Sequence, residues 1–138
     1  PEVEVLRRYH HGFDPHDLAA SGLQALLPAA LVVKARALVQ QVVVEDGILA
    51  YISRLAAASR QSPDITLGAS TRAATHVLLS AKTAAALQGR TFVTPDDVKF
   101  VLPPVFRHRL LLKPEAEIEG LDADAVIARL LGQVEVPR

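Results

Sequence analysis

Hydrophobic positions recur at helical spacing along most of the chain and predict a series of helices joined by short loops. After Pro28, apolar residues fall at i, i+4, i+7, i+8 and i+11, which is the spacing of one face of an amphipathic helix. These residues are Leu31, Ala35, Leu38, Val39 and Val42. The pattern therefore predicts an amphipathic helix with one apolar face in this segment.

Three later segments carry a similar signal. A helix from Asp46 to Ser59 would bury Ile48, Ile52, Leu55 and Ser59 on one side. A helix capped by Ser70 and ended by Gly89 would bury Ala74, Val77, Leu78, Ala81 and Ala85. A last helix capped by Asp122 would direct Val126, Ile127, Leu130, Leu131 and Val134 inward. The alanines of the middle helix indicate that a neighbouring helix approaches it closely.

The sharpest local signal is Thr94-Pro95-Asp96-Asp97. Thr is a favoured N-cap, Pro suits the first helical position, and Asp97 stands where a capping box has Glu or Gln. The helix is expected to stop near Pro103-Pro104, because proline interrupts the hydrogen-bond ladder.

The remaining segments are shorter or less regular. Residues 3–9 are typical of a helix end, broken at Gly12, and Asp14-Pro15 predicts a helix running to about Leu27. We expect an extended joint at 42–44, a loop at 61–68, a small strand at 110–112 and a solvated turn at 115–120. The predicted fold class is all-α, a small helical bundle with at most one very short strand pair.

Composition supports a packed domain and narrows its function. Half of the 138 residues are hydrophobic and only 4% are aromatic, and there are 15 basic and 15 acidic residues. A zero net charge disfavours nucleic acid as a partner. The absence of cysteine fits a cytoplasmic protein. No apolar run approaches the roughly 18 residues needed for membrane insertion.

Most self-contained catalytic and metal-binding motifs are missing. No Gly is followed by Lys, so there is no Walker A phosphate loop, and no Walker B acid pair follows an apolar strand. His10, His11 and His16 do not have zinc-ligand spacing, and we expect no metal site there. The chain by itself is therefore not expected to be an enzyme.

One segment has a clear chemical logic, Gly68-Ala69-Ser70-Thr71-Arg72-Ala73. A glycine turn leads into a helix whose first turn carries an arginine. Free N–H groups and the dipole at a helix start favour an anion, and a guanidinium pairs well with phosphate oxygens. The alternative interpretation is that Arg72 is an exposed surface arginine on an ordinary helix.

Arg107-His108-Arg109 is a second candidate. One interpretation is a contact with a neighbouring subunit or client. The other is a surface cluster whose positive charges pair with the acidic residues Glu115, Glu117 and Glu119.

Several motifs, in order, resemble the C-terminal lid domain of MoxR-family AAA+ ATPases. The strongest is residues 62–73, where the family usually shows G-A-S-P-R and this chain has Thr71 in place of Pro. The resemblance continues through residues 88–99, 107–110 and 115–120, and upstream through 8–15. It covers nearly the whole chain.

This resemblance implies a division into residues 1–13, the end of the AAA+ core with its connector, and residues 14–138, the helical lid. It implies that ATP and Mg²⁺ bind between the core and the lid, with Arg72 as the sensor 2 arginine and Gly68, Ala69, Ser70 and Ala73 beside the nucleotide. The implied partners are the protein's own AAA+ core, neighbouring subunits of a ring, usually a hexamer, and a von Willebrand A-domain protein. The implied output is chaperone-like remodelling of clients such as metalloenzymes.

An alternative function is a histone-like or adaptor helical module. The segment from Thr94 to Leu110 also resembles the end of a histone fold, in which a short loop leads into a helix with an Asp-Val step. A DNA-binding version would need a basic face, which the charge balance disfavours.

Overall fold

The computed structural model describes residues 1–17 and 23–137, and these are mostly helical, as predicted. The chain divides into two compact units, Pro1–Ala35 and Arg36–Arg138. The first unit holds α1 (Glu2–His10), which buries none of its side chains, and the start of α2 (Ala29–Gln40). Gly12, with φ of 87°, follows α1 where the break was predicted.

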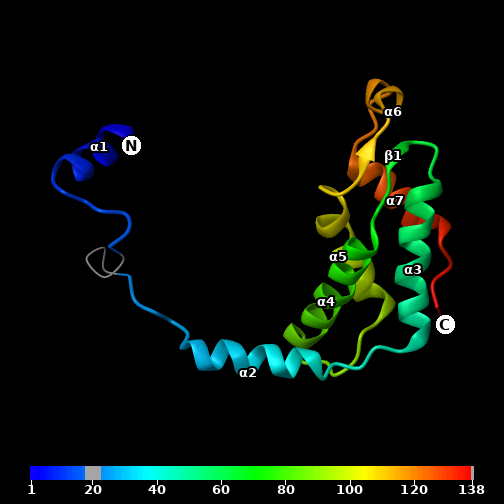
Figure 1. The fold of residues 1–138 in the computed structure, drawn as a ribbon, viewed down its shortest axis with the longest axis horizontal. Helices are drawn as coiled ribbons and strands as arrows, with labels where there is room; N and C mark the ends of the chain where they lie inside the picture. Colours follow the sequence, from blue (N-terminus) through cyan, green and yellow to red (C-terminus); the bar gives the residue numbers. More distant parts are fainter. Residues whose placement is uncertain (18–22, 138) are drawn as a thin grey trace. The chain divides into compact units, whose positions relative to one another are not determined.

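The second unit is a helical bundle with one short antiparallel strand pair (Figure 1). Its helices are α3 (Asp46–Gln61), α4 (Thr71–Leu87), α5 (Pro95–Phe106), α6 (Pro114–Ile118) and α7 (Ala123–Gln133). Its strands, β1 (Ile65–Leu67) and β2 (Leu111–Leu112), pair antiparallel with Ile65 opposite Leu112. The strand predicted at 110–112 is therefore confirmed, whereas its partner lies in a segment predicted to be a loop.

The core forms where α3, α4, α5 and α7 meet. Its largest fully buried side chains include Tyr51, Leu55, Val77, Leu102, Phe106 and Ile127. On α4 the buried positions are mostly alanines, which let α5 pack closely along it, as the sequence indicated. A smaller cluster of Ile65, Leu112, Val126 and Leu130 attaches the strand pair to α7.

Two joints fix the entry into this bundle. Val43 forms a parallel bridge with Phe92, through Val43 N–H to the Thr91 carbonyl (2.8 Å) and Val93 N–H to the Val43 carbonyl (3.0 Å). The Lys82 ammonium donates to the Gln40 carbonyl at 2.7 Å, at the end of α2. The extended joint predicted at 42–44 thus pairs, through Val43, with the connection between α4 and α5.

Of the two helices predicted near the N-terminus, one is confirmed and the other is wrong. The helix predicted after Pro28 exists, but α2 has no buried residues, and Leu38 is 56% exposed. Helical spacing marks an apolar face without specifying what covers it. The helix predicted from Asp14 to about Leu27 is absent from described residues 13–17 and 23–27, which have a turn at 15–16, a bend at 26–27 and otherwise no regular structure. Residues 18–22 lie outside the described chain.

Two later boundaries also differ from the prediction. Helix α5 continues past Pro103 and Pro104 to Phe106, although each proline removes one N–H from the ladder, because the buried Phe106 anchors the last turn in the core. The solvated turn predicted at 115–120 contains the short helix α6, which buries Ala116 before Gly120 ends it with a positive φ. In both places a buried side chain, Phe106 or Ala116, accompanies helix that the local signals did not predict.

Candidate functional site

The candidate site is built around the turn that leads from β1 into α4. Gly68 lies so close to α3 that a Cβ at this position would be 2.6 Å from the Arg60 Cα and 2.7 Å from the Arg60 Cγ. Contacts this short with backbone atoms are not tolerated, so only glycine fits without moving α3. The glycine therefore serves the close approach of the turn to the last turns of α3.

Two α3 side chains hold the residue after this glycine. The Ser59 hydroxyl, fully buried, accepts from the Ala69 N–H at 2.9 Å and donates to the Ala56 carbonyl at 2.7 Å. The Arg60 Nη1 donates to the Ala69 carbonyl at 2.7 Å. Both backbone polar groups of the buried Ala69 are therefore satisfied by α3.

Helix α4 begins as the sequence predicted. Ser70 is its N-cap, and its hydroxyl accepts from the Ala73 N–H at 3.3 Å. Within the described chain, no hydrogen bond occupies the N–H groups of Thr71 and Arg72. These two donors, at the positive end of a 17-residue helix, remain available to an anion.

Arg72 is exposed in the first turn of α4, and among residues 1–17 and 23–137 no acceptor or carboxylate engages its guanidinium. Helical spacing puts it on the side of α4 that carries Leu79 and Thr83, opposite the buried alanines. A free guanidinium next to unoccupied N–H groups can bind an anion such as a phosphate group.

A shallow hollow of about 260 Å³ lies beside this turn, between α3 and α4. It is lined from α3 by Leu49, Ile52, Ser53, Ala56 and Arg60, and from α4 by Thr71, Ala74, Thr75 and Leu78. Its walls combine aliphatic side chains with hydroxyls and one cation. Such a surface can accept the edge of a bound molecule or of another domain.

The predicted site residues therefore have distinct places. Gly68 and Ala69 form the turn, Ser70 and Ala73 form the cap, and Arg72 alone presents a charged side chain to solvent. The sequence placed Ser59 on the buried side of its helix but gave neither Ser59 nor Arg60 a role at this turn. That role depends on contacts across nine or ten residues, which have no local signature.

The second candidate segment is partly engaged within the fold. Arg107 forms a two-point ion pair with Asp124 at 2.9 and 3.0 Å, rather than with Glu115, Glu117 or Glu119. Arg109 donates to the Val105 carbonyl at 2.6 Å, and His108 is exposed. Arg107 thus ties the end of α5 to the start of α7.

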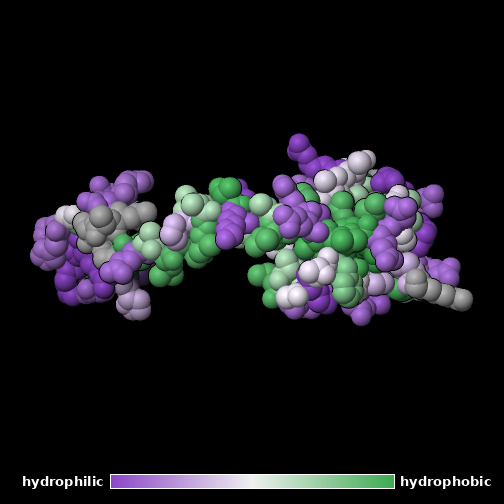
Figure 2. All heavy atoms as spheres, turned by 90° about the horizontal axis from the view of Figure 1, so that it is seen from below, coloured by the Kyte–Doolittle hydropathy of each residue, from purple (hydrophilic) through white to green (hydrophobic). Residues whose placement is uncertain are grey.

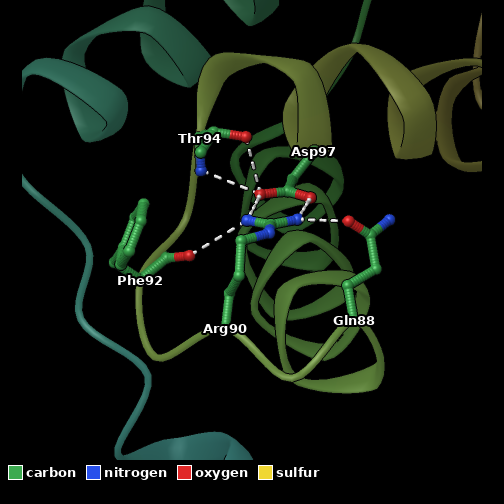
Figure 3. Close-up of polar contacts among 5 residues, drawn as sticks. All are labelled: Gln88, Arg90, Phe92, Thr94 and Asp97. Atoms are coloured by element: carbon green, nitrogen blue, oxygen red, sulfur yellow. Dashed lines mark hydrogen bonds and ion pairs between the residues drawn. The ribbon is translucent and has the colours of Figure 1, made fainter.

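A polar cluster around the Asp97 carboxylate lies at the start of α5 (Figure 3). The Arg90 guanidinium donates to both Asp97 oxygens, at 2.7 and 2.5 Å, and Asp97 also accepts from the Thr94 N–H (2.8 Å) and hydroxyl (2.9 Å). These contacts confirm the predicted capping box and add Arg90, which the sequence did not single out as its partner. The hydrogen bond from Arg90, and secondly those from Thr94, lower the pKa of Asp97 from 3.8 to about 2, against the opposing effect of burial.

Across 1–17 and 23–137, no three His, Asp or Glu side chains come together in a group able to hold a metal ion. In the same residues, no helix has both the length and the apolar content to cross a bilayer.

Comparison with known proteins places this architecture in a family. The family model described as AAA lid domain matches residues 57–130. YeaC of Bacillus subtilis is 36% identical over 99 residues, covering 72% of this chain and 31% of that protein. The chaperone MoxR1 of Mycobacterium tuberculosis is 32% identical over 104 residues, covering 69% and 28%.

A solved structure from Cytophaga hutchinsonii, of a protein assigned as an ATPase, superposes with a TM-score of 0.79 at 29% identity. The superposition covers 99% of this chain and 43% of that one. The chain spans about a third of the length of the two relatives named above. These likenesses agree with the helical bundle and the α3–α4 turn described above. Together with the matched family model, they identify the chain as an AAA lid domain, of the kind found in MoxR-family AAA+ ATPases.

Proposed function

We propose that this chain is the nucleotide-sensing lid of a MoxR-type AAA+ ATPase, in which Arg72 is the sensor 2 arginine. The observation that carries the proposal is an exposed guanidinium with no partner among the described residues, placed in the first turn of α4 beside two unoccupied N–H groups. In this role Arg72 pairs with the terminal phosphates of ATP, and the pairing is lost when the phosphate leaves.

The rest of the site belongs to an AAA+ core domain. Residues 1–13 are proposed as the end of that core with its connector, and 14–138 as the lid. ATP and Mg²⁺ bind between core and lid, and hydrolysis changes the angle between them. In the cytoplasm the subunits assemble into a ring, usually a hexamer. Each subunit of the ring passes this motion to the next one.

The output proposed is chaperone-like remodelling of client proteins such as metalloenzymes, next to a von Willebrand A-domain partner. The printed name of the MoxR1 relative, a chaperone, supports the first part of this proposal. A subunit or client contact at residues 107–109 would rest mainly on His108, because Arg107 and Arg109 are already engaged. The AAA lid match favours this function over a histone-like or adaptor module.

The test is Arg72→Ala in the full-length protein that carries this chain. Losing a charge-assisted contact to phosphate should lower ATP turnover about tenfold or more, with the melting temperature unchanged. Arg129→Ala is the matched control, since Arg129 is an exposed α7 arginine paired with Asp64 at 3.2 Å. Normal turnover and normal nucleotide affinity in the Arg72 variant would refute the sensor assignment.

A further inference from the structure

The sensor helix can act only if its first turn is held in place, and the contacts that hold it come from α3. Helix α3 precedes α4 in the chain, and residues 62–70 form a connection that includes β1. Of this connection, Ala69 is the residue attached to α3 through both of its backbone polar groups. The place of the α4 start is therefore set by the end of α3.

Arg60 makes this attachment in two ways. Its Nη1 donates to the Ala69 carbonyl at 2.7 Å, and its backbone and aliphatic stem lie against Gly68, where even a methyl group would collide. The adjacent Ser59 secures the Ala69 N–H from inside the core. Both the guanidinium and the aliphatic stem of Arg60 therefore contact the turn before α4. The guanidinium of Arg72, in contrast, has no partner in the described chain.

We propose that Arg60, supported by Ser59, is a positioning residue that fixes the first turn of α4 and acts on nucleotide only through Arg72. This inference rests on the proposed function of Arg72 and assigns Arg60 no contact with phosphate. What Arg60 supplies is one hydrogen bond to a carbonyl, which a lysine ammonium can also donate. A phosphate-binding fork, in contrast, would require the planar guanidinium.

The first experiment measures how well the backbone amides at the start of α4 are protected from exchange. Hydrogen exchange followed by mass spectrometry on the full-length protein should show faster exchange in peptides covering residues 70–78 for Arg60→Met, and wild-type exchange for Arg60→Lys. Arg54→Met is the matched control, because Arg54 is also an α3 arginine with one bond to a carbonyl, that of Glu135 at 3.2 Å. Unchanged exchange at 70–78 in Arg60→Met would overturn the proposal.

The second experiment is a double-mutant cycle on ATP turnover. Arg60→Met should lower kcat about three- to tenfold, as expected for the loss of a single positioning hydrogen bond. Combined with Arg72→Ala, it should add less than twofold to the loss seen in Arg72→Ala alone, because a positioning residue has nothing left to position. Multiplicative losses would overturn the proposal and indicate a separate contact.

Arg60→Lys keeps the test decisive if Arg60→Met does not fold. The lysine variant should keep turnover within about twofold of wild type, as one donor suffices. A loss as large as that of Arg72→Ala would overturn the proposal. If Arg72→Ala itself has no effect, the sensor assignment fails, while the exchange experiment still decides whether Arg60 holds the α4 start.

Discussion

The Arg90–Asp97 ion pair predicts a specific dependence of stability on pH. The Asp97 carboxylate is 3% exposed and accepts four hydrogen bonds from Arg90 and Thr94. Its pKa is lowered from 3.8 to about 2. Since each tenfold change in proton affinity is worth about 1.4 kcal/mol, the charged form contributes about 2 kcal/mol to folding at neutral pH.

The sign follows from the direction of that pKa change. A carboxyl group that binds protons more weakly in the folded protein stabilises the fold fully above the unfolded pKa. This stabilisation is lost as the pH falls through the folded pKa. With 3.8 and about 2 as the two values, about 1 kcal/mol should remain near pH 3 and less than half of that near pH 2.

The assay is urea unfolding of the wild type and Asp97→Asn at pH 7, 5, 4 and 3. The variant should be less stable by about 2–3 kcal/mol at pH 7, and the gap should narrow by about 1 kcal/mol by pH 3. Asp96→Asn is the control, because it makes the same charge change at a side chain that is 86% exposed and pairs with Lys99. Its effect should stay below about 1 kcal/mol. A gap for Asp97→Asn that is equal at pH 7 and pH 3 would refute the reasoning.

Two further predictions concern a close backbone approach and a buried hydroxyl, and both are measured by thermal or urea unfolding. Gly68→Ala should cost about 1–3 kcal/mol, because its methyl group would meet the Arg60 backbone, whereas Gly132→Ala, with nothing within 4 Å, should be neutral or stabilise α7 by up to about 1 kcal/mol. Equal effects at the two glycines would contradict the close approach at Gly68. Tyr51→Phe should change stability by less than about 1 kcal/mol, since the buried Tyr51 hydroxyl has no hydrogen-bond partner in the described chain. A loss of several kcal/mol would reveal a bond to that hydroxyl.

Local sequence determined the elements whose signals lie within a few residues. Ser70, Thr94 and Asp122 are N-caps as predicted, because a cap is a contact between a side chain and an N–H two or three residues away. The buried alanines of α4 and the break at Gly89, with φ of 73°, followed from the same short-range rules. Arg72 in the first turn of α4 was foreseen on this basis.

Only the tertiary structure decided what these elements meet. Spacing predicted the apolar face of α2 but not its exposure. The prolines predicted an end of α5 near Pro103-Pro104, although the burial of Phe106 carries the helix to that residue. The contacts of Arg60 with Gly68 and Ala69 also join residues eight or nine apart, across a turn whose path depends on how β1 pairs with β2. Such contacts depend on the whole bundle, because burial and close approach are properties of the neighbours that folding brings together.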